Sequence, residues 1–85
     1  LKKIIKLAEN AGHLFIEAVF LENMKDIAKK KYHLTARQSG MIANMANVKK
    51  LTLFHFSPRY QGVENLLYDE ANSAYQQPVT FQNIT

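Results

Sequence analysis

Eighty-five residues make at most one small domain, and a core of that size gives only marginal stability on its own. The absence of cysteine excludes disulfides and thiolate metal sites, and it favours a reducing, cytoplasmic setting. No stretch approaches the roughly 18 consecutive apolar residues that span a membrane, so we expect a soluble protein without a membrane partner.

Charge divides the chain into a long basic part and a short acidic part. Residues 1–60 hold all eleven lysines and arginines against four acidic residues, a balance of +7, whereas residues 61–85 hold three acidic residues and no base. A basic face of this kind can attract a polyanion such as RNA. The plainer interpretation is that the lysines at 29–31 and 49–50 are solvated at helix ends, where cations are favoured.

The first part of the chain predicts a helix, a strand and a second helix. Apolar residues at helical spacing between lysines predict a helix over residues 1–10, which the pair Ala11-Gly12 ends. A nearly continuous apolar run over residues 14–20 predicts a strand buried on both faces, with Glu17 as a carboxylate in an unfavourable place. Residues 22–31 predict a polar helix that ends in lysines.

The second part of the chain begins with a capping box. In the sequence Thr-Ala-Arg-Gln at residues 35–38, the threonine hydroxyl can accept from the glutamine backbone while the glutamine side chain returns to the cap. A helix therefore starts there, and an apolar stripe carries it to Asn47, a suitable terminator. Residues 51–56 then predict a strand, residues 63–75 an amphipathic helix, and residues 78–81 a short last strand.

The resulting order α-β-α-α-β-α-β predicts an α/β fold with a small parallel or mixed sheet and helical crossovers. Ligand sites in such sheets lie beyond the C-terminal ends of the strands. His55 follows the second predicted strand and His33 precedes the capped helix, so the fold can bring both imidazoles to one edge of the sheet. Three histidines without cysteine or an acidic cluster can contribute to a metal site but can hardly complete one.

Three candidate residues each have a chemical and a structural interpretation. His55 can ligate zinc as a neutral imidazole, or it can be a histidine satisfied in a half-buried turn. His33 can donate a proton near a phosphate at a helix N-terminus, or it can be an exposed loop residue. Glu17 can accept from an imidazole and orient it, or it can be a buried structural carboxylate.

Two further residues suit an anionic group. Arg59 offers a bidentate fork for phosphate and Ser57 places a hydroxyl beside it, although both can equally stabilise a turn. His13 has no supporting context, and we expect it at the surface.

Three segments, in their order and spacing, together resemble the C-terminal region of metallo-β-lactamase-fold hydrolases of the ribonuclease Z type. They are LFIEAVF at residues 14–20, HLTARQ at residues 33–38 and LTLFHFSPRY at residues 51–60. The resemblance extends over about residues 9–80. It implies that the chain is the C-terminal part of the αββα sandwich that characterises this fold.

The resemblance also implies a role for each candidate residue. His55 would be the last metal-ligand histidine, His33 the proton donor to the leaving oxygen, and Glu17 a residue that helps to orient the site. Ser57 and Arg59 would contact the substrate phosphate. In the intact protein two zinc ions, about 3.5–4 Å apart, would activate a water for attack on a phosphodiester. The implied function is a tRNA 3′-end endonuclease whose RNA partner is a tRNA precursor, or a phosphodiesterase with a related substrate.

The chain departs from the family pattern at two positions and lacks other parts of it. Ile16 stands where the family often has histidine, and Val19 where threonine is usual. The His-x-His-x-Asp-His signature, the middle metal histidine and the bridging aspartate are absent from the sequence. We therefore expect residues 1–85, which begin at Leu1 without a methionine, to be a single C-terminal lobe of a longer enzyme and to be inactive alone.

Two properties follow from that expectation. The missing N-terminal half of the same fold would be a partner of this lobe. A sheet face that this half normally covers would make the isolated chain self-associate, so we expect a homo-oligomer.

Two other functions remain open on the sequence alone. The chain can be a non-catalytic α/β module that binds RNA or a partner through its basic face, with incidental histidines. It can also belong to a metallo-β-lactamase-fold hydrolase that cleaves an ester outside nucleic acids.

Overall fold

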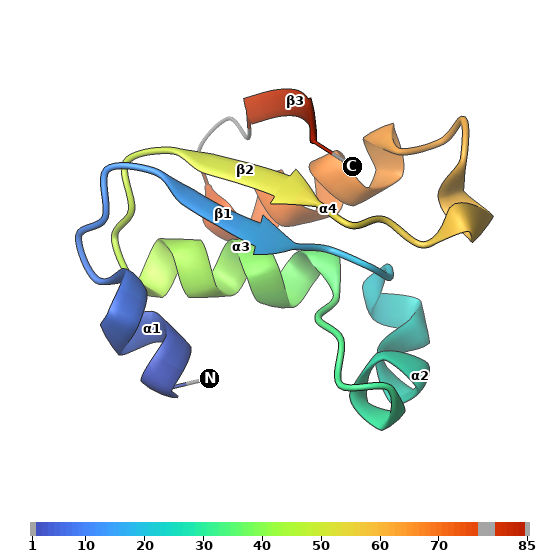
Figure 1. Ribbon diagram of the computed structural model, residues 1–85, viewed down its shortest axis with the longest axis horizontal. Coiled ribbons are helices and arrows are strands. Elements are labelled where there is room, and N and C mark those ends of the chain that lie inside the picture. Colours follow the sequence, from blue (N-terminus) through green and yellow to red (C-terminus); the bar gives the residue numbers. More distant parts are fainter. Residues whose placement is uncertain (1, 77–79, 85) are drawn as a thin grey trace.

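The computed structural model describes residues 2–76 and 80–84, with side chains for residues 3–76. These residues form four α-helices, two short 3-10 helices and three strands. Figure 1 shows the helices beside a small sheet. In chain order the elements are α1 (Lys2–Ala8), β1 (Leu14–Glu17), η1 (Glu22–Met24), α2 (Lys25–Lys30), α3 (Ala36–Met45), β2 (Leu51–Phe54), η2 (Pro58–Tyr60), α4 (Asn65–Tyr75) and β3 (Thr80–Ile84).

The sheet is parallel and has the strand order β1-β2-β3. β1 and β2 pair without irregularity, from Leu14 opposite Leu51 to Glu17 opposite Phe54, so both strands end at the same edge. Figure 1 shows α3 running alongside these strands as part of the crossover between them. The prediction of an α/β fold with a small parallel sheet is therefore confirmed.

The predicted strand over residues 14–20 is too long, and the prediction that it is buried on both faces is wrong. β1 ends at Glu17, and the side chain of Phe15 is half-exposed. Residues 18–20 remain buried. The Ala18 N–H still bonds to the Phe54 carbonyl at the end of β2, but the backbone groups of residues 19 and 20 bond to Leu34, Ser57 and Ala36 outside the sheet. The apolar pattern could not distinguish these two cases, because burial looks the same in a strand and in a covered loop.

The other predicted boundaries differ by smaller amounts. The helix predicted at 22–31 is divided into η1 and α2, and the strand predicted at 51–56 ends at Phe54 because His55 takes a left-handed backbone with φ 62°. The amphipathic helix predicted at 63–75 is α4. Of the strand predicted at 78–81, residues 78 and 79 lie outside the described residues, and β3 begins at Thr80.

The capping box at the start of α3 is present as predicted. The Thr35 hydroxyl accepts from the Gln38 N–H at 3.1 Å, and the Gln38 side chain accepts from the Thr35 N–H at 2.9 Å. The helix ends as predicted at Asn47, whose φ of 55° is left-handed. There the N–H of Val48 bonds to the carbonyl of Ala43, which closes a Schellman turn.

The core lies where α3 and α4 meet the sheet. Its largest fully buried apolar side chains come from α3, β2, α4 and the turn before β2, and they are Ile42, Val48, Leu51, Leu53, Leu67 and Tyr75. The Tyr75 hydroxyl donates to the Val48 carbonyl at 2.7 Å, so the one polar atom of that ring is satisfied inside the core. No helix within residues 2–76 or in the described part beyond them could cross a membrane.

We predict that Gly40→Ala lowers the free energy of unfolding by about 1–3 kcal/mol, because α3 and α4 touch at this position. A Cβ on Gly40 would lie 2.2 Å from the backbone oxygen of Ala71, and a backbone atom cannot move aside alone. Urea denaturation measures the change. Gly12→Ala is the matched control, since a Cβ there meets nothing within 4 Å. Equal stability of the two variants would contradict this account of the helix contact.

Candidate metal and proton-transfer site

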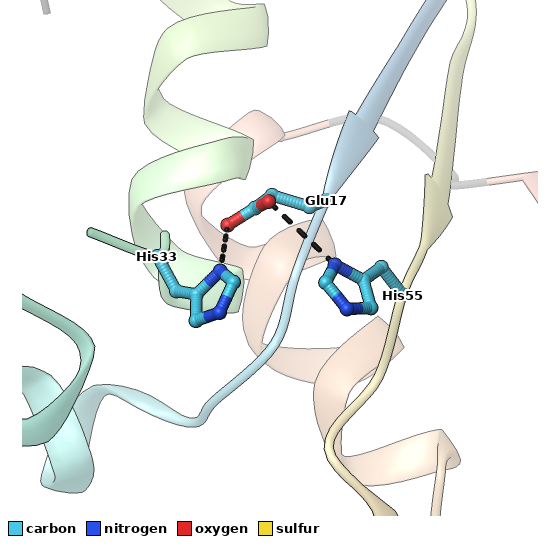
Figure 2. A group of neighbouring side chains, drawn as sticks. All are labelled: Glu17, His33 and His55. Atoms are coloured by element: carbon cyan, nitrogen blue, oxygen red, sulfur yellow. Dashed lines mark hydrogen bonds and ion pairs between the residues drawn. The ribbon is translucent and has the colours of Figure 1, made fainter. Parts of the chain in front are cut away.

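Glu17, His33 and His55 come together at the edge where β1 and β2 end. Figure 2 shows the Glu17 carboxylate between the two imidazoles, with one oxygen turned to each ring. Oε2 lies 3.1 Å from Nδ1 of His33, and Oε1 lies 3.7 Å from Nδ1 of His55. The ring centroids are 5.3 Å apart and the rings are nearly perpendicular. The fold thus unites three residues that are distant in the sequence.

Glu17 makes contacts of the kind that both interpretations from the sequence require. Its Oε2 accepts from the backbone N–H of Leu34 at 2.8 Å as well as contacting His33. Its backbone carbonyl accepts from the hydroxyl of Ser39 in α3. The carboxylate is partly exposed at the strand end, so the prediction that it lies in a fully buried strand is wrong.

His33 is held by the end of α2. The His33 N–H bonds to the carbonyl of Ala28 at 2.8 Å, and the Tyr32 N–H bonds to the carbonyl of Lys29 at 3.2 Å. These are the two hydrogen bonds of a Schellman turn, with Tyr32 in the left-handed conformation at φ 58°. The imidazole therefore follows a fixed helix terminus and is partly buried, which excludes the interpretation of a freely exposed loop residue.

His55 occupies a strained backbone position directly after β2. Its φ of 62° is uncommon for a residue with a side chain, and such a conformation is unfavourable by about 1–2 kcal/mol. The neighbouring backbone is fixed on both sides, because the Ala18 N–H bonds to the Phe54 carbonyl and the Ser57 N–H bonds to the Val19 carbonyl. Strain that the surrounding structure imposes in this way is typical of functional sites.

The three side chains place potential metal-donor atoms close together, and we refer to these atoms as the donor set. One ligand atom from each residue lies within 4.8 Å of the others. Two imidazoles and a carboxylate suit Zn²⁺ and similar first-row ions. An ionised carboxylate only accepts hydrogen bonds, so Nδ1 of His33 donates to Glu17 and Nε2 lies on the side away from it.

Ser57 and Arg59 lie in the turn after His55. The Ser57 hydroxyl accepts from the Arg59 N–H at 3.4 Å and caps η2, so the turn-stabilising interpretation holds for this side chain. The Arg59 guanidinium carbon lies 5.5 Å from the ring centroid of Phe20, and the His33 ring lies 6.3 Å from the same centroid. Contacts of Ser57 and Arg59 with substrate stay a prediction.

Sequence reasoning missed the Glu70 carboxylate, which lies in α4 and joins three elements. It accepts from the Glu22 N–H at 2.9 Å and from the Arg37 N–H at 3.1 Å. Glu22 in turn accepts from the Thr35 hydroxyl at 2.7 Å, beside the loop that carries His33. No local signal could have paired residues 22 and 70, because their contact depends on the packing of α4 against α3.

His13 is also placed differently from the prediction. Its Nε2 lies 2.6 Å from the Thr52 hydroxyl, and its ring stacks on Phe15 with centroids 4.1 Å apart. It is partly buried at the opposite end of β1 from Glu17, so the prediction of an unsupported surface residue is wrong. It takes no part in the group of Figure 2.

We predict that the stability advantage of the wild type over Glu70→Gln shrinks as the pH rises from about 4 to 7. Burial raises the pKa of the Glu70 carboxyl and the Glu22 carboxylate adds to this rise, against the opposing effect of the two N–H groups. The folded protein binds this proton more tightly than the unfolded chain does. The stability that Glu70 contributes is therefore complete below its ordinary pKa and is lost as the pH rises through the raised pKa of the folded state. Urea denaturation at several pH values measures this difference in stability. A wild-type advantage that grows with pH would refute the raised pKa of Glu70.

Comparison with known proteins assigns the fold of the chain to a known class. No protein-family model matches the chain. In structure, the whole chain superposes on the metallo-β-lactamase fold protein YhfI from Bacillus subtilis with a TM-score of 0.84 and 27% identity, covering 32% of that chain. It also superposes on the short form of human tRNase Z with a TM-score of 0.61 and 37% identity, over 67% of this chain and 22% of that one. The chain therefore has part of the metallo-β-lactamase fold.

Relatives in sequence identify the branch of that fold. The chain is 44% identical to ribonuclease Z of Protochlamydia amoebophila over 84% of its length and 23% of the relative. It is 37% identical to ribonuclease Z of Archaeoglobus fulgidus over 92% of its length and 26% of the relative. The chain belongs to the ribonuclease Z type of metallo-β-lactamase-fold proteins, as its motifs predicted, and it spans about a quarter of the length of the curated relatives that it matches.

Proposed function

We propose that this chain supplies the last metal ligand and the proton donor of a zinc-dependent phosphodiesterase that cleaves tRNA precursors at their 3′ ends. The observation that carries the proposal is the Glu17 carboxylate, which contacts both imidazoles through separate oxygens. Relatives named ribonuclease Z and a structural neighbour named tRNase Z support the reaction class. The remaining ligands would come from sequence outside this chain.

Each residue has a defined task in this proposal. His55 holds the metal through Nε2, since its Nδ1 faces Glu17. Glu17 fixes the orientation of both rings. As an imidazolium, His33 keeps its Nδ1–H on Glu17 and gives the proton on Nε2 to the leaving oxygen of the substrate, which leaves a neutral ring. The bound zinc ions, two in the intact enzyme, would supply an activated water and stabilise the charge on the phosphate.

Charge on this part of the chain supports a polyanionic substrate. The exposed Arg59 side chain lies over Phe20, whose ring is also a neighbour of the His33 ring, so the guanidinium and the proposed proton donor share one aromatic neighbour. A guanidinium there can bind a phosphate next to the scissile one. Ser57, which caps the turn, would contact the same phosphate with its hydroxyl hydrogen.

The two departures from the family pattern lie outside this site. Ile16 and Val19 are both buried among apolar residues, and neither belongs to the group of Glu17, His33 and His55. Their apolar side chains therefore affect packing beneath the strand end and leave the donor set unchanged. This placement supports the assignment of ribonuclease Z chemistry to a chain with an altered strand motif.

We predict that, in the full-length protein, His55→Ala loses bound zinc, whereas His33→Ala keeps nearly all of it and loses turnover by about 100-fold to 10,000-fold. His55 is the proposed ligand, and His33 acts on the leaving group. Metal analysis and cleavage of a tRNA precursor measure the two effects. His13→Ala is the matched control, since that histidine contacts Thr52 away from the site.

Equal zinc loss in the His33 and His55 variants would show that the two roles are assigned wrongly. If the full-length protein cleaves a small phosphodiester such as bis(p-nitrophenyl) phosphate but not tRNA precursors, its substrate is not RNA. A full-length protein that binds zinc and cleaves neither would favour a binding module.

A further inference from the structure

Tyr32 combines a strained backbone with an almost completely exposed side chain. It takes the left-handed conformation at φ 58°, yet 95% of its surface is accessible. The ends of α1 and α3 place Asn10 and Asn47 in the same region of backbone space, and asparagine tolerates it far better than an aromatic residue. Because the Tyr32 ring buries almost nothing within the described fold, packing does not offset the strain.

The surroundings of Tyr32 form an open hollow next to the candidate site. The hollow has a volume of about 540 Å³, within the range of ligand pockets. Its lining includes Ile4, Lys25, Asp26, Lys29, Tyr32 and His33. Two ammonium groups against one carboxylate favour an anion, and the aromatic ring offers a flat apolar face. The hollow shares His33 with the group of Figure 2.

We propose that this hollow is a nucleotide subsite, in which Tyr32 stacks on a base of single-stranded RNA while Lys25 and Lys29 contact its phosphate. Exposed aromatic rings flanked by cations bind single strands in this way, because every base has a face that can stack. The tyrosine ring loses little conformational freedom on binding, since it has two side-chain torsions. The proposal rests on the proposed function at one point: His33 protonates the leaving oxygen, so the bound nucleotide is the one on the leaving-group side of the cut.

The left-handed backbone of residue 32 allows the ring to be removed without destabilising the fold. Tyr32→Asn places at this helix end the residue type that already ends α1 and α3, so we expect the stability in urea to be unchanged or slightly higher. Loss of RNA binding in this variant would then reflect the missing ring. Tyr32→Phe keeps the ring and removes only the hydroxyl.

Fluorescence anisotropy with 5′-labelled hexauridylate measures binding by the full-length protein. We expect Tyr32→Asn to bind about tenfold more weakly, and Tyr32→Phe to stay within about twofold of the wild type. Met45→Asn is the control, because Met45 is an exposed apolar residue outside the hollow. Unchanged affinity in Tyr32→Asn, or an equal loss in the Met45 variant, would overturn the subsite.

Two more measurements separate this proposal from simple charge attraction and from the proposed function. Inorganic tripolyphosphate has no base, so the wild type and Tyr32→Asn should bind it with equal affinity. Stacking would be refuted if Tyr32→Asn lost as much affinity for tripolyphosphate as for hexauridylate. In the full-length protein, Tyr32→Asn should raise KM for a tRNA precursor and leave the hydrolysis of bis(p-nitrophenyl) phosphate unchanged. An unchanged KM in Tyr32→Asn would refute the subsite and leave the proposed function standing. A wild-type protein without phosphodiesterase activity would refute the proposed function.

Discussion

Four residues that leave the sheet, 17–20, hold together the segments that carry the candidate chemistry. Their backbone groups bond to Ser39 in α3, to Phe54 at the end of β2, to Leu34 and Ala36 around the capped helix start, and to Ser57 in the next turn. Each such bond contributes only about 1 kcal/mol net, but a buried group left without its partner is unfavourable by about 1–3 kcal/mol. The segment therefore has one low-energy arrangement, and His33 and His55 are fixed relative to it.

The same segment explains why a single carboxylate can organise the site. Glu17 is the last residue of β1, so its position is fixed by the parallel ladder on one side and by the buried residues 18–20 on the other. Its two oxygens are then placed between loops that approach from different elements. A side chain on a free loop would need additional contacts to hold this geometry, because rotamer freedom opposes it.

Sequence reasoning predicted the features that depend on neighbouring residues and missed those that depend on residues far away in the sequence. The capping box at residues 35–38 and the terminator Asn47 act through hydrogen bonds within a few residues, so both were readable. The end of β1 depends on partners fifteen or more residues away, and so does the acceptor role of Glu70. Tyr32 gave no signal, because tyrosine is seldom the residue that ends a helix in the left-handed conformation. The meeting of the two histidines was expected only as a consequence of parallel strands, and their roles came from family resemblance.

Parallel pairing of β1 with β2 also has a consequence for the order of folding. The pairing joins residues 14 and 51, which are 37 positions apart, with α3 in the connection between them. Contacts of such long range form slowly, because the loss of chain entropy precedes the gain from packing. The group of Glu17, His33 and His55 assembles only when this closure is complete. A newly made chain would therefore bring these three side chains together late, with its global fold.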